Sequence, residues 1–185
     1  MRRREALRAI GAAAVAPLLL PLSARERWAL GRRLHQQLGS VRAGQALSAA
    51  QLAQVRALAD TILPRTDTPG ALDVGAPEFV DLLLAAWYPE EERTRLLAGL
   101  DALDARCREA HGKPLAELAA PERADFLASV DGKRGAAGSP EDAYTREKDG
   151  IVFAFLTSKP IAAIVNTTPI IPGRFDGCIP LGGAR

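Results

Sequence analysis

Histidine, cysteine and aromatic residues are scarce in this chain of 185 residues, which holds two histidines, two cysteines and 5% aromatic residues. His35 and His111 lie far apart and not at metal-ligand spacing from cysteines or carboxylates, so we interpret each as a lone surface histidine. The patterns Gly-x-Gly-x-x-Gly, Cys-x-x-Cys-His and Gly-x-Ser-x-Gly are also missing, which argues against a Rossmann-type cofactor site, covalent c-type haem and a hydrolase nucleophile. The sequence therefore predicts no catalytic, cofactor-binding or metal-binding residue in this chain.

Charge of one sign is also lacking, since 24 basic residues oppose 22 acidic residues and the formal net charge is +2. Four of the arginines and one glutamate lie within the first 24 residues, so the remainder is close to neutral. Without a basic patch there is no electrostatic case for nucleic-acid binding. An apolar fraction of 48% suits a chain that buries the core of one domain.

The first 24 residues have the order of an export signal. A head rich in arginine precedes an apolar stretch of 12 residues (9–20), which is too short to cross a bilayer as a helix. Small residues follow, and we expect cleavage after Ala24. The head resembles the twin-arginine signal and departs from it at Ala6; the matching positions are Arg3, Arg4, Leu7 and Arg8. A basic amphipathic helix and a retained anchor are the alternatives.

Helical periodicity dominates residues 25–157, and the fold class predicted is all-α, a small domain of about five helices. An Arg-rich segment with leucines four residues apart (Leu30, Leu34, Leu38) comes first. Ser48 with Gln51 is typical of a capping box, and Pro64 ends the helix that follows. Further helices are expected from the prolines and caps that begin them, at Pro77, Pro89, Pro121 and Ser139–Pro140.

A turn is predicted between the helix that ends at Pro64 and the helix that begins at Pro77. Its side chains are expected to bond their own backbone, and its residues are Thr66, Asp67, Pro69 and Gly70. A rigid connection between helices and a direct partner contact are both compatible with it.

The segment 158–185 has a different character, because four prolines and four glycines disfavour a long helix there. Its isoleucines and Phe175 give it much apolar surface. We expect an extended arm that packs on its own domain or on a partner.

Two segments carry a family resemblance. They are Leu58–Ala71 (LADTILPRTDTPGA), which continues as Val74–Asp81 (VGAPEFVD), and Pro172–Pro180 (PGRFDGCIP). Together they resemble the gluconate 2-dehydrogenase subunit 3 family, and the likeness runs from about Ser48 to Leu181. The stretch 159–168 departs from the family by being more apolar and less acidic.

The resemblance implies a non-catalytic small subunit of a periplasmic, membrane-associated sugar or polyol dehydrogenase. In that family the FAD lies in a large partner of the glucose-methanol-choline oxidoreductase type, and a multihaem cytochrome c with haem c often forms a third subunit. The small subunit is implied to escort the flavin subunit through the twin-arginine translocase and to assist its assembly. Substrate contacts are then expected mainly in the partner chain.

Within this resemblance, the C-terminal strip is expected to meet the partner, because aromatic and arginine side chains anchor interfaces. The expected interface residues are Arg174, Phe175, Asp176, Cys178 and Ile179. Cys107 lies on the apolar stripe of a predicted helix and is expected to be buried and inert. For Cys178 the sharper hypothesis is an intersubunit disulfide with the flavin subunit; an internal bridge to Cys107 and a free thiol are the alternatives.

The competing function is a stand-alone exported module that binds carbohydrate or cell wall. Such a module is expected to have a cleft lined with aromatic side chains. The candidates Trp28, Trp87, Tyr88 and Tyr144 are scattered over separate segments, so the sequence favours the accessory subunit.

Overall fold

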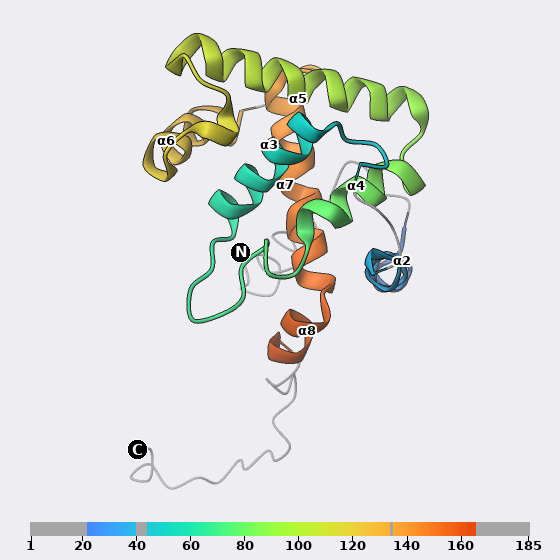
Figure 1. The fold of residues 1–185 in the computed structure, drawn as a ribbon. Coiled ribbons are helices and arrows are strands. Elements are labelled where there is room, and N and C mark those ends of the chain that lie inside the picture. Colours follow the sequence, from blue (N-terminus) through green and yellow to red (C-terminus); the bar gives the residue numbers. More distant parts are fainter. Residues whose placement is uncertain (1–21, 40–43, 134, 166–185) are drawn as a thin grey trace, which may run out of the picture.

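Helix α7 (Pro140–Thr157) runs through the middle of the domain and contacts nearly every other helix (Figure 1). The computed structural model describes residues 22–39, 44–133 and 135–165. Around α7 lie the remaining elements in chain order: α2 (Ala24–Leu38), α3 (Ala49–Ile62), α4 (Ala76–Trp87), α5 (Glu90–His111), the 3-10 turn η1 (Leu115–Glu117), α6 (Ala120–Val130) and α8 (Lys159–Val165). Within these ranges there is no strand, which confirms the predicted all-α class.

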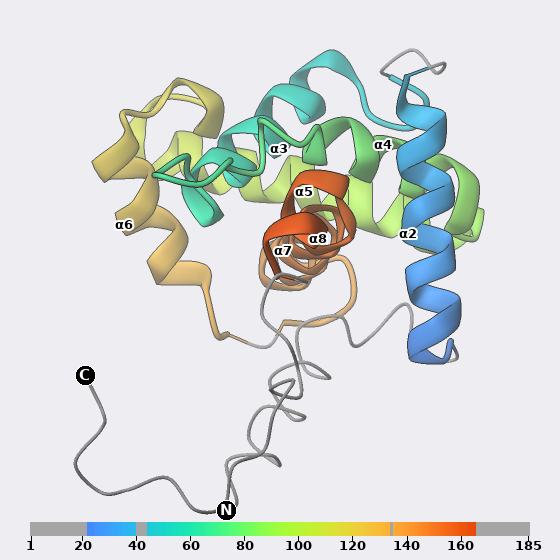
Figure 2. The ribbon, with the colours of Figure 1, turned by 90° about the horizontal axis from the view of Figure 1, so that it is seen from below.

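Figure 2 looks along α7 and α8, with α2 on one side of them and α6 on the other. α5, the longest helix, packs along α7, as does α4. The side chains between these helices form one apolar core that includes Phe79, Leu100, Leu103 and Ile151, all excluded from solvent. None of the described helices has the length and apolar content needed to cross a bilayer.

Local signals set the helix ends. The Ser48 hydroxyl accepts the amide hydrogen of Gln51, while the Gln51 side chain accepts that of Ser48, which is the capping box predicted from sequence. Pro89 precedes α5, and Gly112 closes it with φ +71°, a conformation that glycine adopts without steric cost.

A single carboxylate fixes the chain that enters α3. Asp81 of α4, only 1% exposed, accepts hydrogen bonds of 2.7–2.9 Å from the backbone amides of Gly44, Gln45, Ala46 and Leu47. These four hydrogen bonds satisfy backbone amides that would otherwise need water as their partner. The segment 44–47 is thereby held against α4.

The structure has seven α-helices in its described part instead of about five. α2 forms over the Arg-rich segment, and α8 forms where an extended arm was expected, so that expectation is wrong for residues 159–165. Pro160 is the second residue of α8, a position in the first turn where a missing amide hydrogen removes no helical bond. The amide of Ala162 bonds the carbonyl of Ser158, and Ile161 is buried against the core. The remainder of the arm lies outside the described residues.

Candidate functional site

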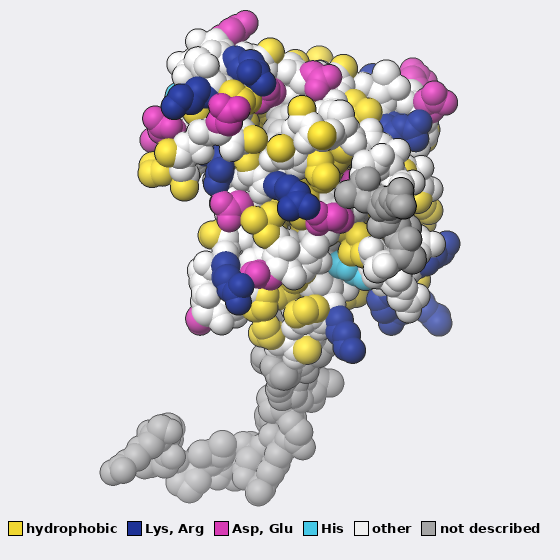
Figure 3. All heavy atoms as spheres, viewed as in Figure 1, with side chains coloured by type: hydrophobic (Ala, Val, Ile, Leu, Met, Phe, Trp, Pro, Cys, Tyr) yellow, Lys and Arg dark blue, Asp and Glu magenta, His cyan; other side chains and the backbone are white. Residues whose placement is uncertain are grey.

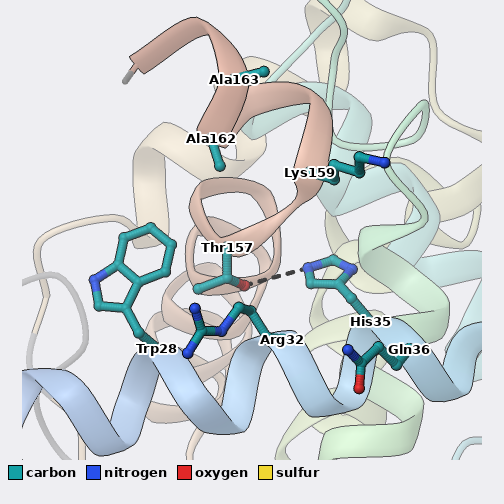
Figure 4. A pocket seen from close by; sticks show the side chains of 8 residues that line it. All are labelled: Trp28, Arg32, His35, Gln36, Thr157, Lys159, Ala162 and Ala163. Atoms are coloured by element: carbon teal, nitrogen blue, oxygen red, sulfur yellow. Dashed lines mark hydrogen bonds between the residues drawn. The ribbon is translucent and has the colours of Figure 1, made fainter. Parts of the chain in front are cut away.

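An open groove lies between α2 and the junction of α7 with α8 (Figure 4). We call it the α2–α8 groove; its volume is about 750 Å³. Its lining mixes apolar side chains with two cations and comprises Trp28, Arg32, His35 and Gln36 of α2, Thr157 of α7, and Lys159, Ala162 and Ala163 of α8. Trp28 stands opposite Ala162 across the groove, and 46% of its surface is exposed.

Gly31 lets α2 approach α7 closely, and this contact forms the floor of the groove. A Cβ atom at Gly31 would lie 2.7 Å from both Cβ and Cγ2 of Thr157, which is closer than real carbon contacts allow. Leu30 and Leu34, on either side of Gly31, are buried in the core. The floor of the groove therefore depends on a residue without a side chain.

His35 locks the same contact. Its Nε2 lies 2.9 Å from the carbonyl oxygen of Ala154 and 3.3 Å from the hydroxyl of Thr157. The amide of Ser158 donates to the carbonyl of Phe155 and not to that of Ala154. His35 therefore supplies a donor to the Ala154 carbonyl near the end of α7. Because the acceptor is a carbonyl, Nε2 carries the proton.

The His35 ring also packs against Phe79, with centroids 4.6 Å apart. Burial lowers the pKa of the imidazole, which favours its neutral form. The prediction of a surface histidine is therefore wrong for His35, because contacts 119 residues apart in sequence cannot be seen in a local pattern. His111 is exposed, and its ring meets Phe126 edge-on.

The groove is suited to binding. Trp28 offers an aromatic face, the alanines offer apolar contact, and Arg32 and Lys159 are exposed cations. Among the described residues no group of three histidine, cysteine or carboxylate side chains is arranged to hold a metal ion.

The domain also contains a buried acid that the sequence analysis missed. Glu147 of α7 is 1% exposed, and neither of its carboxyl oxygens has a hydrogen-bond partner. Burial raises its pKa to about 8, so the carboxyl is protonated at neutral pH. The signal was available, since Glu147 stands four residues from Ala143 and Ile151 on the buried stripe of the predicted helix.

The predicted end of the export signal falls within a folded cap. Ala24 is the first residue of α2 and is exposed. Just before it, the Ser23 hydroxyl accepts the amide of Glu26, the Glu26 carboxylate accepts the amide of Ser23, and Leu22 packs against the core. Cleavage after Ala24 would remove this cap. The signal residues Arg3, Arg4, Leu7 and Arg8 lie outside the described residues.

The predicted turn at 66–70 joins α3 to the segment before α4. Thr66 and Asp67 are exposed, Pro69 is half-buried, and Gly70 is buried. A Cβ at Gly70 would lie 2.6 Å from the backbone nitrogen of Arg65, so the backbone closes on itself here. The Asp73 carboxylate holds the turn by accepting the Gly70 amide and pairing with Arg65.

The expected interface residues Arg174, Phe175, Asp176, Cys178 and Ile179 lie outside the described residues. Cys107 is inside them, and it is a free, fully buried thiol on α5. Burial raises the pKa of this thiol, which disfavours the reactive thiolate.

Comparison with known proteins identifies a family that matches this chain. The chain matches the family described as Gluconate 2-dehydrogenase subunit 3 over residues 49–173, about two thirds of its length. No curated protein and no solved structure matches it. The matched range covers α3 to α8 and includes the turn at 66–70 on which the resemblance rests. The chain therefore belongs to the gluconate 2-dehydrogenase subunit 3 family.

Proposed function

We propose that this chain is the non-catalytic small subunit of a periplasmic FAD-dependent sugar or polyol dehydrogenase. Its family makes it a subunit of a dehydrogenase complex. In the proposal the FAD belongs to a large partner of the glucose-methanol-choline type, and a multihaem cytochrome c is a possible third subunit. This chain escorts the flavin subunit through the twin-arginine translocase and stabilises it in the assembled complex.

The observation that carries the proposal is the position of the α2–α8 groove. One wall is α2, which begins at Ala24, the last residue of the predicted export signal. The other is α8, which ends at Val165, in the sequence before the predicted interface strip Pro172–Pro180. The first and last helices of the described domain thus line the same open groove. An exposed tryptophan and arginine between them are the residue types that anchor protein interfaces.

Purification of the tagged chain from periplasm and membranes tests the assignment. We expect a stoichiometric partner of roughly three times this mass, a usual size for a two-domain flavin enzyme, together with a flavin absorbance spectrum. A colourless monomer, recovered under conditions that preserve complexes, would contradict the proposal.

Export of the partner tests the escort role. With Arg3→Lys and Arg4→Lys together, both this chain and the flavin subunit should stay in the cytoplasm, because the partner depends on the leader of this chain. The matched control is Arg25→Lys with Arg27→Lys, just outside the predicted signal, which should leave both chains exported. A flavin subunit that still reaches the periplasm with the signal variant would refute the escort role.

A covalent link between the subunits is the third part of the proposal. Non-reducing electrophoresis should show one band with the summed mass of the two chains, and Cys178→Ser should separate it into two. Cys107→Ser should leave the single band, because Cys107 is buried. Two separate bands from the unmodified complex would exclude the intersubunit disulfide.

One observation favours the alternative, a stand-alone carbohydrate-binding module: Trp28 is exposed in an open groove beside hydrogen-bonding side chains, the arrangement on which sugar rings stack. Titration of the purified chain with gluconate or glucose, followed by Trp28 fluorescence in a Trp87→Phe background, separates the two functions. The accessory subunit predicts no saturable change.

A further inference from the structure

We propose that the α2–α8 groove receives an acidic segment of the catalytic partner subunit that also presents apolar side chains. This inference rests on the proposed function and specifies where, and through which chemistry, the two chains meet.

Charge is segregated along the chain. α2 carries four arginines and one glutamate, and Lys159 adds a cation from α8. Residues 44–158, by contrast, hold 19 acidic and 12 basic side chains. On the face shown in the space-filling view, Lys and Arg side chains accordingly gather over α2 and beside α8 (Figure 3). The groove is therefore the cationic part of a domain that is otherwise acidic.

The cations that line the groove take no part in the ion pairs of the described residues. Among the described residues, every ion pair is made by cations between Arg56 and Lys148. Neither Arg32 nor Lys159 belongs to one of these pairs, although both line the groove. Cations that the domain does not neutralise itself steer an acidic partner toward the groove.

The shape of the groove also suits a protein segment. The groove has a volume of about 750 Å³, and its apolar lining comes from Trp28 and the two alanines of α8. A concave site of this size encloses a group of side chains, whereas the flat surface of an anionic membrane would leave the lining uncovered. A protein segment fits both the charge and the shape of the groove if its carboxylates pair with Arg32 and Lys159 and an apolar side chain inserts beside Trp28.

Charge also disfavours the other possible occupants. Residues 166–185 of this chain contain one acid, Asp176, and two arginines, Arg174 and Arg185. A second copy that docked by the same face would place its own cationic α2 against this one, because a twofold interface pairs identical surfaces. We therefore assign the acidic segment to a different chain.

Reversing the charges of Arg32 and Lys159 tests the inference in the coexpressed complex. With Arg32→Glu and Lys159→Glu together, we expect the molar ratio of flavin subunit to tagged chain to fall at least tenfold at low salt, because two attractive contacts become repulsive. The wild-type ratio should fall as sodium chloride is raised, whereas the variant ratio should not. The helix content of the variant, measured by circular dichroism, should equal that of the wild type, since both side chains are exposed.

The matched control reverses two cations that make none of the ion pairs above. Lys113, which follows α5, and Lys133, which follows α6, are exposed, and α6 lies on the opposite side of the domain from α2 (Figure 2). Lys113→Glu with Lys133→Glu makes the same change in net charge and should leave the ratio within twofold of the wild type. A tenfold fall in this control would attribute the effect to net charge and overturn the inference.

A photo-crosslinker identifies the occupant directly. Trp28 is replaced by p-benzoylphenylalanine in the full chain, the complex is irradiated, and the crosslinked peptide is identified by mass spectrometry. An acidic segment of the flavin subunit is the expected product. Crosslinks to residues 166–185, to a second copy or to lipid overturn the inference, as does an intact complex without any crosslink to the flavin subunit.

The two proposals fail differently. If the wild-type chain retains no flavin subunit, the proposed function is wrong. If the wild-type chain retains it and the Arg32→Glu, Lys159→Glu variant retains it equally well, the subunits meet elsewhere, and only the groove assignment is wrong.

Discussion

The carboxyl group of Glu147 is the most unusual side chain of the core, because it is buried without a hydrogen-bond partner. Isolated ionised carboxylates are costly in an apolar interior, so such groups take up a proton instead. Burial raises the pKa of the Tyr88 hydroxyl, the charges of Glu147, Glu92 and Asp149 raise it further, and Arg146 lowers it. Burial raises the pKa of Asp149 as well, to about 7.

Glu147 therefore makes the stability of the domain depend on pH. Its pKa is about 8 in the folded state against an ordinary value of 4.5. Below pH 4.5 both the folded and the unfolded chain hold the proton, and the free energy of unfolding is not reduced by this carboxyl group. As pH rises toward 8, the unfolded chain releases the proton first, so the free energy of unfolding falls by up to about 1.4 kcal/mol per pH unit.

Glu147→Gln should remove most of this slope, because glutamine stays neutral. We expect the variant to be more stable than the wild type at pH 8 by about 3–5 kcal/mol and similar to it at pH 4.5. Denaturant unfolding across this pH range measures the difference, and any slope that persists reports Asp149. Glu109→Gln, on an exposed part of α5, should keep the wild-type slope. If Glu147→Gln also keeps it, the carboxyl is ionised in the fold.

At the scale of helices, the contact of α2 with α7 depends on Gly31. Replacing glycine by alanine within a helix normally stabilises a protein, because alanine has the higher helix propensity. At Gly31 the added methyl would collide with Thr157. We expect Gly31→Ala to destabilise the domain by about 1–3 kcal/mol, as measured by urea unfolding.

Gly39 provides the control in the same helix. It closes α2 with φ −71°, and a Cβ there would meet nothing within 4 Å. Gly39→Ala should therefore be neutral or slightly stabilising. Equal effects of the two substitutions would mean that α2 does not approach α7 as the structure shows.

The anchoring of segment 44–47 on α4 gives a second prediction at this scale. Asparagine at position 81 keeps one acceptor oxygen but turns an amide donor toward at least two of the four backbone amides. We expect Asp81→Asn to cost about 2–4 kcal/mol of stability, because those amides lose their partners, with the midpoint of urea unfolding as the readout. Asp67→Asn, in an exposed turn, should change stability by less than about 0.5 kcal/mol.

Helix ends were predictable from sequence, whereas the groove was not. The capping box at Ser48, the proline before α5 and the glycine after it are local signals that act within a few residues. The groove needs α2 to meet residues 154–163, and no local pattern reports the absence of a Cβ at Gly31 or the bond from His35 to Ala154. The sequence does not predict α8, because the prolines and glycines of 158–185 disfavour a long helix, whereas Pro160 stands in the first turn of a short one.

For the whole molecule, α7 is the element on which the others depend. It contacts α2, α3, α4, α5, α6 and α8, and it buries Tyr144, Ile151 and Phe153 among them. Without α7, the apolar faces of α4 and α5 would lie open to water.

Two truncations test this dependence. A chain that ends at residue 139 retains five of the seven helical segments and should nevertheless lack a cooperative unfolding transition. A chain that ends at residue 157 keeps α7 and should retain both the transition and most of the helix content, since α8 adds only seven residues. Thermal unfolding followed by circular dichroism gives both results, and a cooperative transition in the shorter chain would show that α7 is dispensable for the core.

The place of α7 in the chain sets the timing of folding during synthesis. Every helix that it touches except α8 leaves the ribosome earlier, so α3 to α6 emerge with their apolar faces waiting for a partner made after them. If the chain travels by a route that accepts only folded cargo, translation must pass Thr157 before transport can begin, and chaperones that cover apolar surface have their opportunity before that point.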